Sequence, residues 1–274
     1  MNNDTTATDP TTPPVTLVFA GLDPTGGAGL QADIEAIASM GGHAAPVATC
    51  LTVQDTANVI EVTPVGPALI AEQARAVLED MPVAGIKLGL LPDTGVVEAI
   101  HSILVDYPTL PVVLDPVLAS GSGKHLSSEE TTAAMRELLL PQTTIATPNS
   151  LEARQLAPEA DSLEASAMAL LDTGCDYVLV TGTHEATPEV INTLYGNHRQ
   201  LDQYRWERLE GSYHGSGCTL ASAIAALLSQ GSEVPAIIEA AQHYAWRALE
   251  HGRRIGMGQL LPDRFYWTGG YHET

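Results

Sequence analysis

A glycine-rich turn, His214 to Cys218, stands directly before a run in which apolar side chains recur at helical spacing, Leu220 to Leu228. Its glycines, Gly215 and Gly217, allow the backbone to approach a ligand closely. The N–H groups of a helix N-terminus attract anions because that end carries about half a positive charge. With Ser216 between its glycines, the turn predicts a site for a transferring phosphoryl group. Taken alone, it is equally compatible with a helix start whose glycines serve only tight packing.

Cys218 is the candidate general base of this turn. A thiol beside helix N-terminal amides is expected to have a lowered pKa, so that a thiolate becomes accessible near neutral pH. Such a thiolate would accept a proton from a substrate hydroxyl, whereas the alternative is a buried structural cysteine. A histidine next to glycine, as at His214, is more typical of a group that orients the turn than of one that exchanges protons.

A second glycine-rich segment, Gly121 to His125, resembles part of a phosphate-binding P-loop without fitting that motif. Leu118 stands where the first glycine is required, and His125 stands where a serine or threonine must follow the lysine. The turn at 214–218 also does not place its cysteine between glycines as a nucleophile elbow would, which disfavours a hydrolase.

The charge composition limits how an anionic ligand can be held. The chain has 12 basic and 33 acidic residues among 274, a formal net charge of -21, and its two lysines are Lys87 and Lys124. No basic block occurs, which argues against nucleic-acid binding. Backbone N–H groups, metal ions and very few cationic side chains must therefore neutralise any bound phosphate.

The cysteines and the N-terminus bear on the location of the protein. Three widely separated cysteines indicate a reducing compartment, and a cytoplasmic enzyme fits. The longest apolar runs are well short of the roughly 20 residues that a membrane-spanning helix needs. The polar, proline-containing segment Met1 to Pro14 is predicted to be a disordered tail, and 15–274 to be one domain.

Short apolar runs alternate with helix-like stretches along the chain. The runs predicted as strands are Val15–Ala20, Ala44–Val53, Gly85–Leu91, Pro111–Leu114, Thr144–Thr147 and Tyr177–Val180. A helix is predicted after the first glycine loop, where Leu30, Ile34 and Ile37 recur at helical spacing. The other predicted helices are Ala68–Leu78, Thr94–Leu104, Glu129–Leu139, Leu163–Leu171, Cys218–Ser229 and Pro235–Glu250, with a possible hairpin between Thr193–Tyr195 and Arg199–Arg208. This alternation predicts an α/β fold with a mostly parallel central sheet and helices on both faces, and an active site at the carboxyl ends of the strands.

Six ordered motifs resemble those of the hydroxymethylpyrimidine and phosphomethylpyrimidine kinases of thiamine biosynthesis. They are Ala20–Asp33 (AGLDPTGGAGLQAD), Leu51–Thr56 (LTVQDT), Ile86–Leu91 (IKLGLL), Val112–Val117 (VVLDPV), Thr147–Glu152 (TPNSLE) and His214–Leu220 (HGSGCTL). The resemblance covers about Leu17 to Arg254. It implies a three-layer α/β/α ribokinase-like fold. It also implies two ATP-dependent steps at one site, phosphorylation of 4-amino-5-hydroxymethyl-2-methylpyrimidine and conversion of its monophosphate to the diphosphate.

The same resemblance assigns roles by position. The expected pyrimidine pocket consists of Gly21, Asp23, Ala28, Asp33, Thr52, Gln54, Leu90 and Leu118. The Gln54 amide offers both a donor and an acceptor to the aminopyrimidine edge. The expected nucleotide contacts are Asn149, Thr181, Gly182, Gly215 and Gly217, and the expected Mg2+ ligands are Asp115 and Glu152. Seen separately, Asp115-Pro116 is more typical of a strand-ending turn and Thr147-Pro148-Asn149 of a loop cap than of a ligand site.

One departure from the family affects the nucleotide site. Where many relatives read Val-Lys-Gly-Gly-His, this chain has Val180-Thr-Gly-Thr-His184, so that Thr181 can donate a hydrogen bond to a phosphate but supplies no charge. Lys87 is expected to form a structural ion pair within the sheet layer rather than to contact a ligand.

Two other functions stay open at this stage. A pyridoxal kinase has the same fold and a similar cysteine-containing turn, and Gln54 with the Gly21–Ala28 loop favours the pyrimidine over it. A non-catalytic pyrimidine-binding protein would not need Asp115, Asn149, Glu152 and Cys218 together. The resemblance also suggests a homodimer formed through strands near Ala44–Val53.

Overall fold

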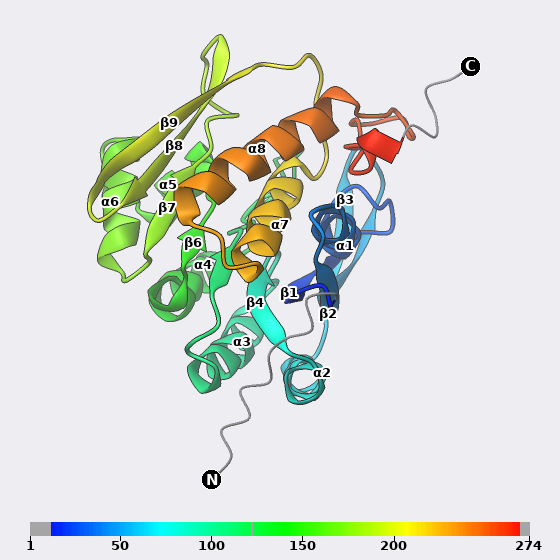
Figure 1. Ribbon diagram of the computed structural model, residues 1–274, viewed down its shortest axis with the longest axis vertical. Coiled ribbons are helices and arrows are strands. Elements are labelled where there is room, and N and C mark those ends of the chain that lie inside the picture. The colour runs from blue at the N-terminus through cyan, green and yellow to red at the C-terminus, as the bar shows by residue number, and fades with distance from the viewer. Residues whose placement is uncertain (1–11, 122, 269–274) are drawn as a thin grey trace.

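The computed structural model describes residues 12–121 and 123–268, which form one nine-stranded sheet between two layers of helices (Figure 1). The strands are β1 (Val15–Leu22), β2 (His43–Gln54), β3 (Val59–Pro64), β4 (Val83–Leu88), β5 (Val112–Leu114), β6 (Ile145–Ala146), β7 (Tyr177–Val180), β8 (Glu189–Gly196) and β9 (Arg199–Glu207). The helices are α1 (Gly29–Ser39), α2 (Pro67–Asp80), α3 (Thr94–Asp106), α4 (Glu129–Ala134), α5 (Ser150–Leu156), α6 (Leu163–Asp172), α7 (Ser216–Ser229) and α8 (Val234–Glu250).

The central sheet has the order β3-β2-β1-β4-β5-β6-β7-β8-β9. The strands from β2 to β7 are parallel, whereas β3 at one edge and the β8–β9 hairpin at the other are antiparallel to their neighbours. Chain order reverses beside β1, where the chain runs first to β2 and later to β4. Such a switch point opens a crevice at the carboxyl ends of the strands, and ligands of open α/β sheets bind there. The predicted α/β class and mostly parallel sheet are confirmed.

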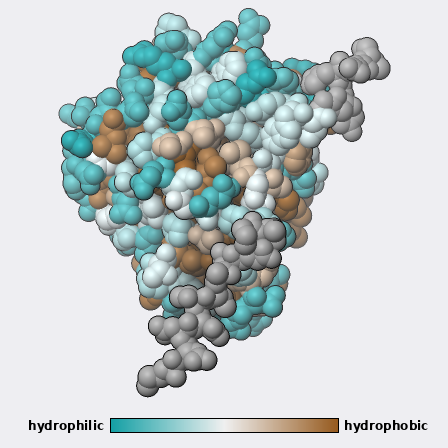
Figure 2. All heavy atoms as spheres, viewed as in Figure 1, coloured by the Kyte–Doolittle hydropathy of each residue, from teal (hydrophilic) through white to brown (hydrophobic). Residues whose placement is uncertain are grey.

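Helices cover both faces of the sheet, and each layer has its own buried cluster. The larger cluster packs strand residues such as Leu17 and Phe19 against α2, α3, α5 and α6. On the opposite face, α1, α7 and α8 bury Ile37, Ile224 and Ile238 in two smaller clusters. Figure 2 shows hydrophobic side chains gathered near the centre of the face over α7 and α8, surrounded by hydrophilic ones.

The predicted elements are present, with three differences. β3 was not predicted because Glu61 interrupts its apolar pattern and most of its side chains face solvent. α5 was not among the predicted helices, and a capping box formed by the Asn149 and Glu152 side chains starts this short helix. The helix predicted over Glu129–Leu139 is α-helical only to Ala134 and continues as a π-helical turn.

The predicted tail 1–14 lies outside the described residues apart from residues 12–14. Among the residues described, no helix is long and apolar enough to cross a membrane.

Candidate active site

Asp23 organises the glycine loop that follows β1. Its carboxylate accepts hydrogen bonds from the Thr25 N–H and hydroxyl at 2.8 Å and from the Ala28 N–H at 2.9 Å. It also lies 2.8 Å from Nε2 of His214, in the second glycine turn. Burial by itself would raise the pKa of Asp23, but hydrogen bonds from His214, Gln54 and Thr25 hold that pKa well below its ordinary value. His214 therefore orients the turn, as its position beside a glycine suggested.

The second glycine turn packs directly against the first. Gly215 is the N-cap of α7 and has a left-handed φ of 83°. A Cβ at this position would lie 1.9 Å from the carbonyl oxygen of Gly27, so only glycine fits. The two backbone segments are thus in contact, with the free N–H groups of the first turn of α7 at the cavity.

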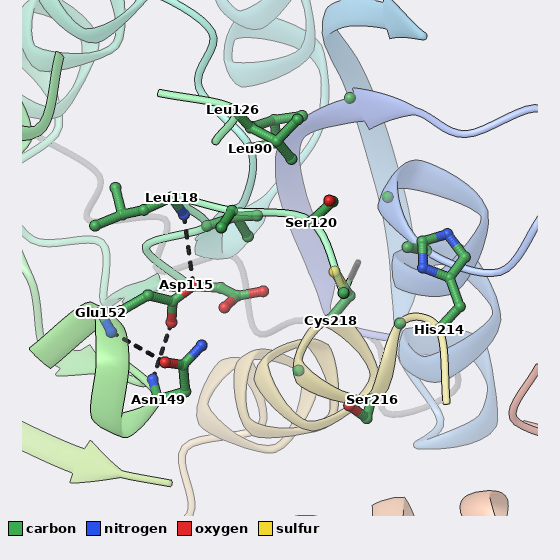
Figure 3. A pocket seen from close by; sticks show the side chains of 18 of the residues that line it. Leu90, Asp115, Leu118, Ser120, Leu126, Asn149, Glu152, His214, Ser216 and Cys218 are labelled. Carbon is green, nitrogen blue, oxygen red and sulfur yellow. Dashed lines mark hydrogen bonds between the residues drawn. The ribbon is translucent and has the colours of Figure 1, made fainter. Parts of the chain in front are cut away.

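The cavity between these turns and the ends of β5 and β6 has a volume of roughly 480 Å³. Figure 3 shows Cys218 on its α7 side and Asn149 with Glu152 across from it, with Asp115 between Glu152 and Cys218. The predicted residues that line the cavity are Gly21, Asp23, Ala28, Thr52, Gln54, Leu90, Asp115, Leu118, Asn149, Glu152, Thr181, Gly215, Ser216, Gly217 and Cys218. Residues from all six sequence motifs are therefore brought to one cavity.

Asp33 is the first correction to the predicted pocket. It is fully buried and does not line the cavity. Its Oδ1 accepts hydrogen bonds from Lys87 Nζ at 2.8 Å and from the Ser222 hydroxyl at 2.6 Å. The carboxylate therefore balances the buried charge of Lys87 instead of meeting a substrate. The structural ion pair predicted for Lys87 is present, and Lys87 itself also reaches the cavity wall.

Gly182 is the second correction. Its N–H donates to Oδ1 of Asn192 at 3.0 Å, and a Cβ there would lie 2.1 Å from the carbonyl oxygen of Ile191. The glycine serves the close approach of β7 and β8, and only its neighbours Thr181 and His184 line the cavity. His184, which we did not assign from sequence, ends the same Val180–His184 motif.

Two carboxylates face each other at the opposite wall. Glu152 accepts hydrogen bonds from the Asn149 N–H at 2.9 Å and the Leu118 N–H at 3.4 Å, while Oδ2 of Asp115 has no hydrogen-bond partner among the described residues. Burial, followed by the charge of Asp115, raises the pKa of Glu152 to about 8. Burial also raises the pKa of Asp115, against the opposing charge of Lys87. Removal of this repulsion requires a proton or a cation.

These groups fit a hard cation that keeps several of its waters. Within residues 12–121 and 123–268, no group of three or more histidine, cysteine or acidic side chains is arranged to enclose a metal. Mg2+ is commonly held by one or two carboxylates together with substrate phosphates. The unpartnered oxygen of Asp115 and the raised pKa of Glu152 match that mode of binding.

Cys218 differs from its prediction in protonation state. Burial, then the negative charge of Asp115, raises the pKa of the thiol to about 12, although the charge of Lys87 acts in the opposite direction. The prediction of a lowered pKa is therefore wrong for the ligand-free site. The helix N-terminus was visible in the sequence, whereas the carboxylate of Asp115 beside the sulfur was not.

Arg264 is the principal residue that the sequence did not indicate. It is 2% exposed and hydrogen-bonds the Gly27 carbonyl of the first glycine loop and the hydroxyl of Thr219, the residue after the second turn, although it lies near the C-terminus. The resemblance ended at about Arg254, so this arginine fell in a segment without any recognised motif.

The three-layer fold has a cavity at its switch point, with a helix N-terminus on one side and paired carboxylates on the other. This combination defines a small-molecule kinase of the ribokinase-like class. Residues 23–263 match the family model described as phosphomethylpyrimidine kinase. The chain is 36% identical to the hydroxymethylpyrimidine/phosphomethylpyrimidine kinase of Synechococcus elongatus, over 92% of this chain and 98% of that protein.

Solved structures give the same fold. The ADP complex of Bacillus subtilis pyridoxal kinase superposes with a TM-score of 0.85 at 26% identity, covering 92% of this chain and 98% of that one. The phosphomethylpyrimidine kinase of Clostridium difficile superposes with a TM-score of 0.75 at 29% identity, covering 86% and 99%. The chain belongs to the phosphomethylpyrimidine kinase family.

Proposed function

We propose that this protein transfers the γ-phosphoryl group of ATP to the hydroxymethyl group of 4-amino-5-hydroxymethyl-2-methylpyrimidine, and then to the resulting monophosphate. The observation that carries the proposal is a single cavity with two chemically different walls. Leu90 and Leu118 supply apolar surface at one wall, and the Gly215–Cys218 turn supplies anion-binding N–H groups at another. Both transfers need these parts in one place, because phosphoryl transfer is catalysed mainly by positioning and charge stabilisation.

The pyrimidine is placed between the glycine loop and Leu90. Gln54 lies at the cavity wall near Asp23, whose pKa it helps to lower, so its amide lies beside the glycine loop. An amide can both donate to and accept from the aminopyrimidine edge. The substrate hydroxyl then points toward Cys218 and the first turn of α7.

Asp115 and Glu152 would hold Mg2+, with Asn149 beside them at the phosphates. When bound, the ion supplies positive charge against these carboxylates and the phosphate oxygens of ATP. The charge of Asp115 is one cause of the raised pKa of Cys218, so compensation of that charge favours deprotonation of the thiol. Cys218 is placed to accept the substrate proton under that condition.

The nucleotide end of the cavity lacks a lysine. Thr181 supplies a hydroxyl and His184 an imidazole at this wall. The α7 amides and the metal therefore carry a larger share of phosphate binding than in relatives with a lysine at the position of Thr181.

A coupled ATP-consumption assay tests the proposal with three acceptors: the hydroxymethylpyrimidine, its monophosphate and pyridoxal. We expect turnover with the first two. Pyridoxal is included because the pyridoxal kinase fold superposes closely on this chain. Turnover with pyridoxal alone would replace the proposed substrate, and binding of the pyrimidine without ATP consumption with any acceptor would favour a non-catalytic protein.

The protein is also proposed to form a homodimer through β2 and β3. Leu51, Val53 and Ile60 of these strands are 49%, 52% and 63% exposed, which leaves an apolar strip at this edge of the sheet. An Ile60→Glu variant should shift the mass measured by light scattering from dimer to monomer, and a monomeric unmodified protein would contradict the proposal. A cytoplasmic location, expected from three cysteines that are free in the structure, remains a prediction.

A further inference from the structure

Arg264 hydrogen-bonds three separate segments of the chain beside the active site. Its Nη1 donates to the Gly26 carbonyl at 3.3 Å, its Nη2 donates to the Gly27 carbonyl, and its Nε donates to the Thr219 hydroxyl at 2.9 Å. Nη1 also pairs with Oε2 of Glu35 on α1 at 3.0 Å. One buried side chain thus contacts the first glycine loop, α1 and α7.

Thr219 extends this connection to the phosphoryl-binding turn. Its hydroxyl accepts the Arg264 hydrogen bond and donates to the carbonyl of Gly215 at 2.8 Å. Gly215 in turn packs against the Gly27 carbonyl that Arg264 holds from the other side. Arg264, Thr219, Gly215 and Gly27 therefore form a closed ring of contacts between the two glycine segments.

The segment that carries Arg264 is itself anchored. The backbone carbonyl of Arg264 accepts hydrogen bonds from the Ser39 hydroxyl at 2.7 Å and from the Tyr244 hydroxyl at 3.1 Å. The side chain is 1% exposed, while that of Glu35 is 26% exposed. Both the backbone and the guanidinium of Arg264 are thus held by hydrogen bonds. This fits a structural role better than movement toward a ligand.

We propose that Arg264 is a positioning residue for phosphoryl transfer, which fixes the position of the Gly215–Cys218 amides relative to the Gly21–Ala28 loop. The inference rests on the proposed kinase function. Arg264 acts through geometry, because Glu35 already balances its charge and its nitrogens are directed at carbonyl and hydroxyl oxygens. A misplacement of about 1 Å in such a site can cost on the order of 100-fold in rate.

The test is a comparison of Arg264→Gln and Arg264→Lys with the unmodified protein. We expect kcat with the hydroxymethylpyrimidine to fall about 10- to 100-fold in both variants, with KM for the pyrimidine changed less than about 3-fold. Lysine keeps the charge but lacks the planar fork. Full activity in the lysine variant would overturn the positioning role, since charge alone would then suffice.

Arg136→Gln is the matched control. Arg136 also makes a bidentate ion pair, with Glu159, at the surface of the opposite helical layer. We expect its kcat to match that of the unmodified protein. Rates are normalised to the folded fraction at assay temperature, and Arg264 variants whose normalised kcat is unchanged would likewise overturn the proposal.

A second pair of variants remains informative if the arginine variants fold poorly. Thr219→Val keeps the shape but removes the hydroxyl, and Thr219→Ser restores it. We expect a kcat loss in the valine variant and near-normal kcat in the serine variant. In a double-mutant cycle, Arg264→Gln should add little further loss to Thr219→Val, because both break one ring of contacts. Full additivity would contradict the coupling.

Amide hydrogen exchange separates this inference from the proposed function. Exchange at Gly217 and Cys218 should be faster in Arg264→Gln and Thr219→Val than in Thr219→Ser or the control, whether or not the unmodified protein consumes ATP. Faster exchange with no turnover in any form would refute the kinase function and leave the connection intact. Unchanged exchange with normal turnover would refute the connection alone.

Discussion

The two walls of the cavity shift the pKa values of their carboxyl groups in opposite directions. On the glycine side, the carboxylate of Asp23 is surrounded by donors, and its pKa is lowered. On the carboxylate side, Asp115 keeps an oxygen without a partner among the described residues, and the pKa of Glu152 is raised to about 8. On the glycine side, protein donors surround the carboxylate before any ligand arrives, whereas on the carboxylate side a bound proton or cation would remove a remaining repulsion between two buried acids.

This contrast indicates that one wall is suited to bind anionic oxygens and the other to bind a cation. A rigid cradle holds anionic oxygens in fixed directions without reorganisation during the reaction. Under the proposed function, the buried pair of acids, Asp115 and Glu152, would favour the metal-bound form of the nucleotide. Substitutions in each wall of the cavity should therefore have different effects.

Cys218→Ala is expected to have the largest effect. Loss of a general base commonly costs about 10² to 10⁴ in rate, so kcat should fall by that order while pyrimidine binding stays largely intact. Steady-state kinetics and calorimetric titration with the pyrimidine measure the two quantities. Unchanged turnover in the alanine variant would remove Cys218 from the base role.

Glu152→Gln tests the carboxylate side. We expect Mg2+·ATP affinity to fall about 10- to 100-fold, as when other groups that support a metal are lost. Because the pKa of Glu152 is raised to about 8 in the folded protein, the acid binds a proton more tightly there than in the unfolded chain. Its contribution to stability is therefore complete below pH 4.5 and is lost as the pH rises toward 8.

The measurement is the Tm of the metal-free protein across that pH range. The unmodified protein should lose Tm between about pH 5 and 8, and Glu152→Gln should show a flatter profile. Parallel profiles for the two proteins would show that Glu152 does not titrate in this window.

Asp23→Asn tests the glycine side. The neutral amide loses charged hydrogen bonds to Thr25, Ala28 and His214, so we expect the free energy of unfolding to fall by about 1 to 3 kcal/mol at neutral pH. The pKa of Asp23 is lowered, so its stabilising effect is present above pH 3.8 and disappears as the pH falls through the lowered value. Urea unfolding at pH 7 and at pH 3 should therefore show a smaller difference between the two proteins at pH 3.

Gln54→Ala has the smallest expected effect. It should weaken pyrimidine binding by about 1 kcal/mol, the typical net value of a hydrogen bond, and leave ATP binding nearly unchanged. Titration with each ligand separately measures both affinities. Equal losses for the two ligands would contradict the placement of Gln54 in the pyrimidine pocket.

The sequence predicted the layered fold from its local strand and helix patterns, and most of the cavity from the resemblance of six short motifs to one family. Strand and helix periods are visible within short windows, and the motifs lie where strands end. Arg264 was not visible, since it is separated from Gly27 by 237 residues and two of its partners are backbone carbonyls. The raised pKa of Cys218 was missed for a related reason: it depends on burial of the thiol and on the charge of Asp115, which the end of β5 brings to the sulfur on α7. Asp33, on α1, was assigned to the pocket although its actual partner, Lys87, lies 54 residues later on β4.

Both lysine side chains of this protein are already engaged. Lys87 pairs with Asp33, and Lys124 donates to the carbonyls of Val59 and Ile60 at 3.0 and 2.7 Å. Aldehydes such as pyridoxal form imines only with uncharged amines, and the neighbouring carboxylates, foremost Asp33, hold the pKa of Lys87 above its ordinary value despite its burial. A vitamin aldehyde that enters the cavity therefore meets no reactive lysine amine, and borohydride treatment of the mixture should leave the cavity lysine unlabelled.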